Sequence, residues 1–207
     1  GLVHKRHLCD PRFVDFKDHS AVEFLDCFLR AARRQEMQSG RMAPWHPDVL
    51  PADVTHVDRI FAFVVETRSL CSVCQAGQSS HELSSILNVT FPEHELNNVL
   101  VSELYLRWCA PASVRIACKG SSCNGGVTLH DVQHRLASLP NVLFVNVDRS
   151  SVASGGGSRT TRSNAVTVEE QLNVPTLGVM DLAGIIYHRG RSAQVGHHTC
   201  VCRGQGN

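Results

Sequence analysis

The sequence carries little net charge and few aromatic residues. Its 207 residues have a formal net charge of +1 at pH 7, and only 6% of them are aromatic. Proteins that bind nucleic acid through a general electrostatic field need a clear excess of basic residues, and those that grip single strands also need aromatic stacking platforms. The composition therefore gives no support to a nucleic-acid partner.

Long hydrophobic runs are also missing. No stretch approaches the roughly 20 apolar residues that a membrane-spanning helix requires, and no basic-then-apolar leader opens the chain. We therefore expect an intracellular protein of the cytoplasm or nucleus, without a membrane partner. The chain is nevertheless 43% hydrophobic, which is enough to bury a core.

Cysteine, by contrast, is abundant. There are nine cysteines, an odd number that excludes complete internal pairing and favours reduced thiols. Four of them form the pairs Cys71-x2-Cys74 and Cys118-x4-Cys123. Structural zinc takes four tetrahedral ligands from two short turns, so we predict that these four residues bind one Zn²⁺. The other five are expected to be small buried hydrophobic residues, namely Cys9, Cys27, Cys109, Cys200 and Cys202.

The periodicity of the sequence predicts both helices and strands. Ser20 and Glu23 form a capping-box pattern at the start of an amphipathic helix over residues 20–37, and the proline-rich residues 39–51 predict a loop. A second short helix is predicted over residues 96–104. Apolar and β-branched runs predict strands at residues 59–67, 83–91 and 113–117, and a buried central strand at 142–147.

The C-terminal third contains further short segments. Residues 150–163 include three consecutive glycines, several serines and several threonines, which predicts a flexible surface loop. The remaining apolar segments lie at residues 165–174, 182–188 and 199–202.

The order of these segments resembles the ubiquitin-specific protease family, the papain-like deubiquitinases with thumb, palm and finger regions. The resemblance covers about residues 13–203, and each motif is weak alone but the order is specific. The matching segments are Ser20-Ala21-Val22-Glu23-Phe24-Leu25, the strand from Phe61 into Cys71-x2-Cys74, the turn from Cys118 to Cys123, Leu139 to Arg149, Ile185 to Gly190, and Gly196-His197-His198.

The resemblance implies an α+β papain-like fold with a zinc-ribbon-like finger. It implies a thumb helix region at about residues 13–50, a finger with the metal clip at 59–123 and a palm at 139–207, and it implies that the domain is incomplete at its N-terminus. The turn from Cys118 to Cys123 is two residues longer than the usual Cys-x2-Cys of the family.

The resemblance also marks His197 as the catalytic base. A cysteine isopeptidase needs an imidazole beside the thiol, because the thiolate is the nucleophile. The nucleophile box of the family, a Gly-x-Thr-Cys-Tyr-like string, does not occur in these residues. Cys9 lacks the required surroundings, and Asn207 follows His197 too soon to be a good third member of a triad.

The implied function is that of a thiol protease, which hydrolyses the isopeptide bond at the C-terminus of ubiquitin or a relative. These 207 residues alone are expected to be inactive, so the nucleophile would come from a longer parent protein. Two alternatives remain open at this point. The protein could be a catalytically degenerate scaffold that binds ubiquitin or other proteins, or the zinc ribbon could be a nucleic-acid-binding module.

Overall fold

The computed structural model of the chain describes six segments, and all statements below refer to them. They are residues 20–40, 54–91, 98–152, 159–161, 165–192 and 195–204. Most of the predicted loop at 39–51, both Cys9 and Asn207, and the glycine triplet within 150–163 lie outside these residues.

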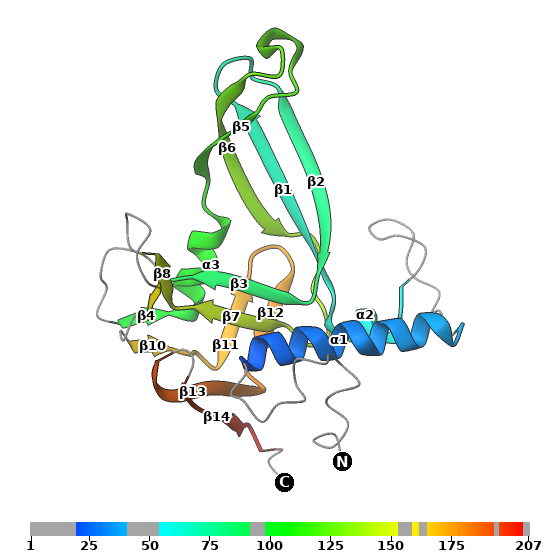
Figure 1. The fold of residues 1–207 in the computed structure, drawn as a ribbon, viewed down its shortest axis with the longest axis vertical. Coiled ribbons are helices and arrows are strands. Elements are labelled where there is room, and N and C mark those ends of the chain that lie inside the picture. The colour runs from blue at the N-terminus through cyan, green and yellow to red at the C-terminus, as the bar shows by residue number, and fades with distance from the viewer. Residues whose placement is uncertain are drawn as a thin grey trace.

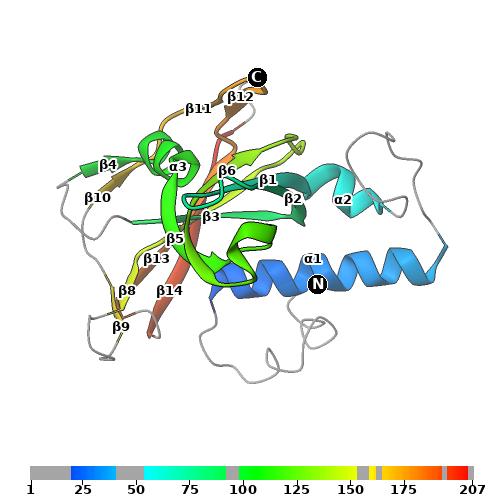
Figure 2. The ribbon, with the colours of Figure 1, turned by 90° about the horizontal axis from the view of Figure 1, so that it is seen from above.

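Helix α1 (Ala21–Gln38) confirms the predicted long helix, and it lies alongside the base of the molecule (Figures 1 and 2). Ser20 occupies the N-cap position but makes no side-chain capping bond, so the predicted capping box is wrong. Cys27 and Leu29 provide the buried face of the helix. No helix in the described segments is both long and apolar enough to cross a membrane.

A capping box does form, but at the next helix, α2 (His56–Phe61). The Thr55 hydroxyl accepts from the Asp58 backbone N–H at 3.1 Å. In return, the Asp58 carboxylate accepts from the Thr55 backbone N–H at 3.0 Å and from the Thr55 hydroxyl at 2.8 Å. The same carboxylate accepts from Arg33 Nε at 2.6 Å, which joins α2 to α1. This network overrides the apolar run that predicted a strand from residue 59, because it satisfies the first backbone donors of a helix.

Four antiparallel strands form a long finger that projects from the rest of the molecule (Figure 1). The strand order is β2-β1-β6-β5, so β1 and β6 lie in the middle. β6 belongs to the finger although it lies beyond the predicted end at residue 123. The strands that lie between β2 and β5 in sequence form ladders outside the finger. The finger strands are β1 (Phe63–Cys71), β2 (Gly77–Ser84), β5 (Ala112–Ala117) and β6 (Val127–Leu136).

A buried carboxylate braces the lower part of the finger. Glu66 of β1 is 4% exposed and accepts from Arg68 Nε at 2.7 Å, from Ser79 Oγ at 3.1 Å and from Arg135 of β6. These bonds, led by that of Arg68, lower the pKa of Glu66 to about 2 despite its burial. Because the folded pKa is depressed, this contribution to stability is present above pH 4.5 and is lost as the pH falls towards 2.

Below the finger, the chain builds a core from short parallel pairings. The predicted strand at residues 83–91 is divided at Ser85, because β2 stays in the finger while β3 (Ile86–Thr90) leaves it to pair in parallel with β7 (Phe144–Asp148). β7 corresponds to the predicted central strand, but its residues are only half-buried and its one ladder in the described residues is with β3. β4 (Asn98–Leu100) pairs in parallel with β10 (Ala165–Thr167).

Helix α3 (Val101–Cys109) covers this core, and it begins later than predicted. The Glu169 carboxylate accepts from the first backbone N–H groups of the helix, at Val101 and Ser102, at 3.0 and 3.3 Å. Such an anion neutralises the positive end of the helix dipole. The core joins the finger base to the body and consists of Phe63, Leu87, Val89, Phe91, Val99, Leu104, Tyr105, Leu136 and Val174.

Three antiparallel hairpins complete the described chain. Residues 150–152 and 159–161 form a ladder between β8 (Ser150–Val152) and β9 (Arg159–Thr161), so the described part of the predicted loop at 150–163 is a β-hairpin. The other two hairpins pair β11 (Gln171–Val174) with β12 (Gly178–Asp181), and β13 (Gly184–Ser192) with β14 (Val195–Cys202).

The joint between α1 and α2 leads to the first prediction. Asp58→Ala removes a buried acceptor that serves both the cap of α2 and Arg33, so we expect it to lower the free energy of unfolding by about 2–3 kcal/mol. Chemical denaturation of the chain measures this loss. Asp26→Asn is the matched control, because its pair with Arg30 is exposed and contributes at most about 0.5 kcal/mol. Equal losses in the two variants would contradict the prediction.

Candidate functional site

The first cysteine turn follows β1 at the far end of the finger. Cys71 is the last residue of the strand, and the chain folds back at once because the Gln75 N–H donates to the Cys71 carbonyl at 3.0 Å. The Cys71 N–H donates in turn to the Ala76 carbonyl at 3.1 Å. Gln75 has a left-handed backbone (φ 58°), which closes the turn and directs Cys71 and Cys74 to the same side.

The second turn follows β5 and contains a short 3₁₀ helix, Ser121–Cys123. The Cys123 N–H donates to the Gly120 carbonyl at 3.0 Å, and the Cys118 N–H donates to the Gly126 carbonyl at 3.0 Å. The extra helical turn takes up the two additional residues of the Cys-x4-Cys spacing. Cys118 and Cys123 therefore still converge.

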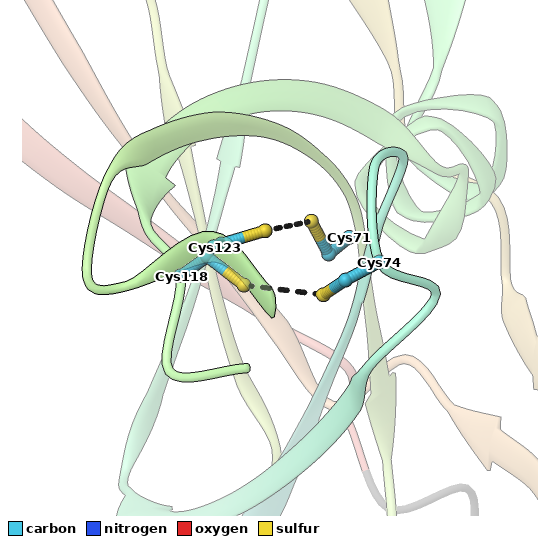
Figure 3. Close-up of side chains that lie close together, drawn as sticks. All are labelled: Cys71, Cys74, Cys118 and Cys123. Atoms are coloured by element: carbon cyan, nitrogen blue, oxygen red, sulfur yellow. Dashed lines mark hydrogen bonds between the residues drawn. The ribbon is translucent and has the colours of Figure 1, made fainter. Parts of the chain in front are cut away.

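The structure brings the four predicted cysteines together at one point (Figure 3). All four Sγ atoms lie within 4.8 Å of one another; Cys71 is 3.9 Å from Cys123, and Cys74 is 3.6 Å from Cys118. A tetrahedral zinc with Zn–S bonds of about 2.3 Å has an S–S edge of roughly 3.8 Å. The sulfur set therefore fits a ZnS₄ centre in both number and spacing.

Gly120 makes room for this cluster. A Cβ atom at this position would lie 2.6 Å from Cys74 Sγ and 3.3 Å from Cys118 Sγ. The backbone of Gly120 is ordinary for any residue (φ −68°, ψ 136°), so the requirement is for space and not for a glycine conformation. Its N–H also donates to Cys118 Sγ at 3.3 Å.

The four thiols influence one another's ionisation. The backbone N–H of Cys74, and then the Thr128 hydroxyl, lower the pKa of Cys71 to about 5. Burial, and then the neighbouring Cys74, raise the pKa of Cys123 to about 12. One thiolate is therefore favoured at neutral pH, whereas four would repel one another unless a cation lay between them.

The predicted base, His197, lies at the other end of the molecule. It is an exposed residue of β14, directly opposite Arg189 of β13. β13 and β14 lie below the body, whereas the cysteine turns lie at the finger tip (Figure 1). On the same ribbon, the rings of His188 and His198 lie 4.9 Å apart between centroids, at an interplanar angle of 45°. The structure thus separates the metal candidates from His197.

The sequence of the chain matches one family over almost its entire length. The family model for ubiquitin carboxyl-terminal hydrolases covers residues 4–207. The chain belongs to this hydrolase family, in its ubiquitin-specific protease branch. No curated protein matches the chain in sequence.

Solved structures support the fold of this hydrolase domain. The chain superposes with a TM-score of 0.78 on a SAGA Ubp8/Sgf11/Sus1/Sgf73 DUB module bound to ubiquitin aldehyde, at 14% identity, covering 99% of this chain and 46% of that one. A SAGA DUB module bound to monoubiquitin gives the same TM-score at 16% identity, covering 99% and 45%. The chain thus spans less than half the length of those proteins. The predicted α+β papain-like fold of the ubiquitin-specific proteases is confirmed.

The prediction for the other cysteines is only partly correct. Cys27 of the hydrolase domain is buried and Cys109 is half-buried, but Cys200 and Cys202 are exposed, with their sulfur atoms 3.4 Å apart. They lie on the same face of β14, and no described element covers that face as a core would. The apolar alternation of the sequence could not reveal this, because it does not say whether a strand has a neighbour.

Sequence reasoning also missed residues that surround the sulfur cluster. Gly120 follows Cys118 by two positions, and a glycine so close to a metal-binding turn is a usable signal. Thr128 bonds to Cys71 Sγ at 3.3 Å, but it lies 57 positions away in another strand. Only the register of β6 brings it there.

Gly120 provides the test of this geometry. We expect Gly120→Ala to lower zinc affinity by about tenfold or more, because the new methyl group would displace the Cys74 sulfur from its ligand position. Competition with a chromogenic chelator measures the affinity. Gly77→Ala is the matched control, because its Cβ would meet only Leu70 at 4.0 Å. Unchanged zinc affinity in Gly120→Ala would show that the sulfur cluster is not the metal site.

Proposed function

We propose that the protein containing these residues is a deubiquitinase, which hydrolyses the isopeptide bond at the C-terminus of ubiquitin. The family match over residues 4–207 carries this proposal. The likeness to DUB modules bound to ubiquitin aldehyde and to monoubiquitin supports ubiquitin as the protein that it binds. We propose no nucleic-acid or membrane partner.

His197 is the proposed general base of this reaction. In the complete protein, a cysteine from outside these 207 residues gives its thiol proton to His197, and the thiolate attacks the carbonyl carbon of the terminal glycine of ubiquitin. Backbone N–H donors hold the oxyanion, and the leaving lysine amine takes the proton from His197. Water then releases ubiquitin from the thioester. The exposed position of His197 on β14 leaves its ring accessible to such a partner.

Zinc is proposed to be structural in this enzyme. Cys71, Cys74, Cys118 and Cys123 would hold the ion at the finger tip, where it ties the end of β1 to the end of β5. The distance of the finger tip from β14 supports a role that excludes bond breaking (Figure 1). A zinc site of four thiolates needs reduced cysteines, which supports an intracellular location in the cytoplasm or nucleus.

A ubiquitin-binding scaffold without activity is the second candidate. The likeness to DUB modules bound to ubiquitin supports a ubiquitin-binding surface in this candidate too. The two candidates make the same prediction for ubiquitin binding and opposite predictions for hydrolysis, so the complete protein distinguishes them.

Zinc content tests the metal proposal. We expect about one zinc per chain in freshly purified, reduced protein, and we expect chelation to lower the unfolding temperature of the finger because the two turns lose their link. Mass spectrometry of the metal and thermal denaturation measure these quantities. Cys74→Ser should abolish stoichiometric zinc, whereas Cys200→Ser, outside the cluster, should retain it. A reduced sample without zinc would contradict the proposal.

Mutation of His197 tests the catalytic proposal in the complete protein. We expect His197→Ala to lower kcat for a fluorogenic ubiquitin substrate by about 10³-fold or more, because the thiol loses its base, while the Kd for ubiquitin stays unchanged. His188→Asn is the control on the opposite strand and should lower kcat less than tenfold. A wild-type protein that binds ubiquitin but neither hydrolyses the substrate nor reacts with a ubiquitin probe would support the scaffold instead.

A further inference from the structure

Two residues of β6 extend from the sulfur cluster into the finger. Cys71 of β1 lies directly opposite His130 of β6, and Thr128 is two positions earlier on the same face of that strand. Thr128 Oγ1 lies 3.3 Å from Cys71 Sγ and 3.1 Å from His130 Nε2. The three polar groups therefore form a continuous chain of hydrogen bonds that ends on a candidate metal ligand.

His130 bonds through only one of its two ring nitrogens. His130 is 0% exposed, and its Nδ1 atom has no hydrogen-bond partner. A neutral imidazole has one N–H donor and one bare acceptor nitrogen. Nε2 takes part in the bond to Thr128 in either neutral tautomer, as the donor if it carries the proton and as the acceptor if Nδ1 carries it. The state of the Cys71 sulfur, at the other end of the chain of bonds, therefore decides between the two tautomers.

A zinc ion bound to Cys71 would fix the direction of both bonds. A metal-bound cysteine is a thiolate and can only accept a hydrogen bond. The Thr128 hydroxyl must then donate to Cys71 Sγ, and its oxygen is left to accept from His130 Nε2–H.

We propose that Thr128 and His130 are positioning residues for the zinc ligand Cys71. His130 orients the Thr128 hydroxyl, and the hydroxyl holds the Cys71 sulfur in its ligand position. This inference rests on the proposed zinc site and deepens it. Residues that hold a metal ligand in this way typically contribute 10–100-fold to metal affinity.

The decisive variant is Thr128→Val, which keeps the shape of the side chain and removes the hydroxyl. In the complete protein, we expect its zinc affinity to fall by about 10–100-fold in competition with a chromogenic chelator. Thr128→Ser restores the hydroxyl and should restore the affinity to near the wild-type value. Loss of packing alone would give the opposite order, because serine removes a methyl group that valine retains.

A second measurement addresses His130 without mutating a buried residue. In zinc-loaded protein labelled with ¹⁵N-histidine, the imidazole of His130 should carry a proton on Nε2 that is hydrogen-bonded to Thr128. In Thr128→Val, its Nε2–H signal should shift because the acceptor is gone.

The outcomes separate this inference from the metal site itself. Wild-type protein that binds no zinc would overturn both. Wild-type protein that binds zinc, with an affinity unchanged in Thr128→Val, would overturn the positioning role alone. A His130 protonated at Nδ1 would likewise overturn it.

Discussion

The structure of the finger tip depends on the link between the two cysteine turns. The hydrophobic core includes Phe63 and Leu136 at the base of β1 and β6, whereas the tip has four sulfur atoms within 4.8 Å and exposed apolar residues such as Leu70, Val73 and Val127. Four adjacent thiols gain little from packing and repel one another when ionised. A divalent cation converts that repulsion into a cross-link, so the same four residues account for the ordered tip in the proposed holoprotein.

The sequence predicted the features that rest on local patterns. The long first helix, the strand at residues 113–117 and the convergence of the two cysteine pairs follow from periodicity and from ligand spacing, and the structure contains all three. The order of weak motifs predicted the family, which the match over residues 4–207 confirms. The catalytic role of His197 stays a prediction.

The features that the sequence could not predict depend on contacts between distant residues. A run with strand propensity becomes helical at Asp58. The Asp58 carboxylate forms a capping box with Thr55 and also accepts from Arg33 of α1, 25 positions away. The break at Ser85 arises because β3 has a parallel partner in β7. Thr128 meets Cys71 only through the register of β6. In each case, tertiary contacts override or add to a local preference.

The two halves of the finger have a consequence for the order of assembly. Cys74 and Cys118 are 44 positions apart, and the intervening chain contains β3, β4 and α3, which belong to the body. During synthesis, the first pair of thiols therefore leaves the ribosome long before the second, and the body segment must be made in between. An ion captured by all four sulfur atoms would close a loop around this segment. Metal capture would then be a late event in biogenesis. A zinc-bound finger tip would indicate that the body segment had already been synthesised.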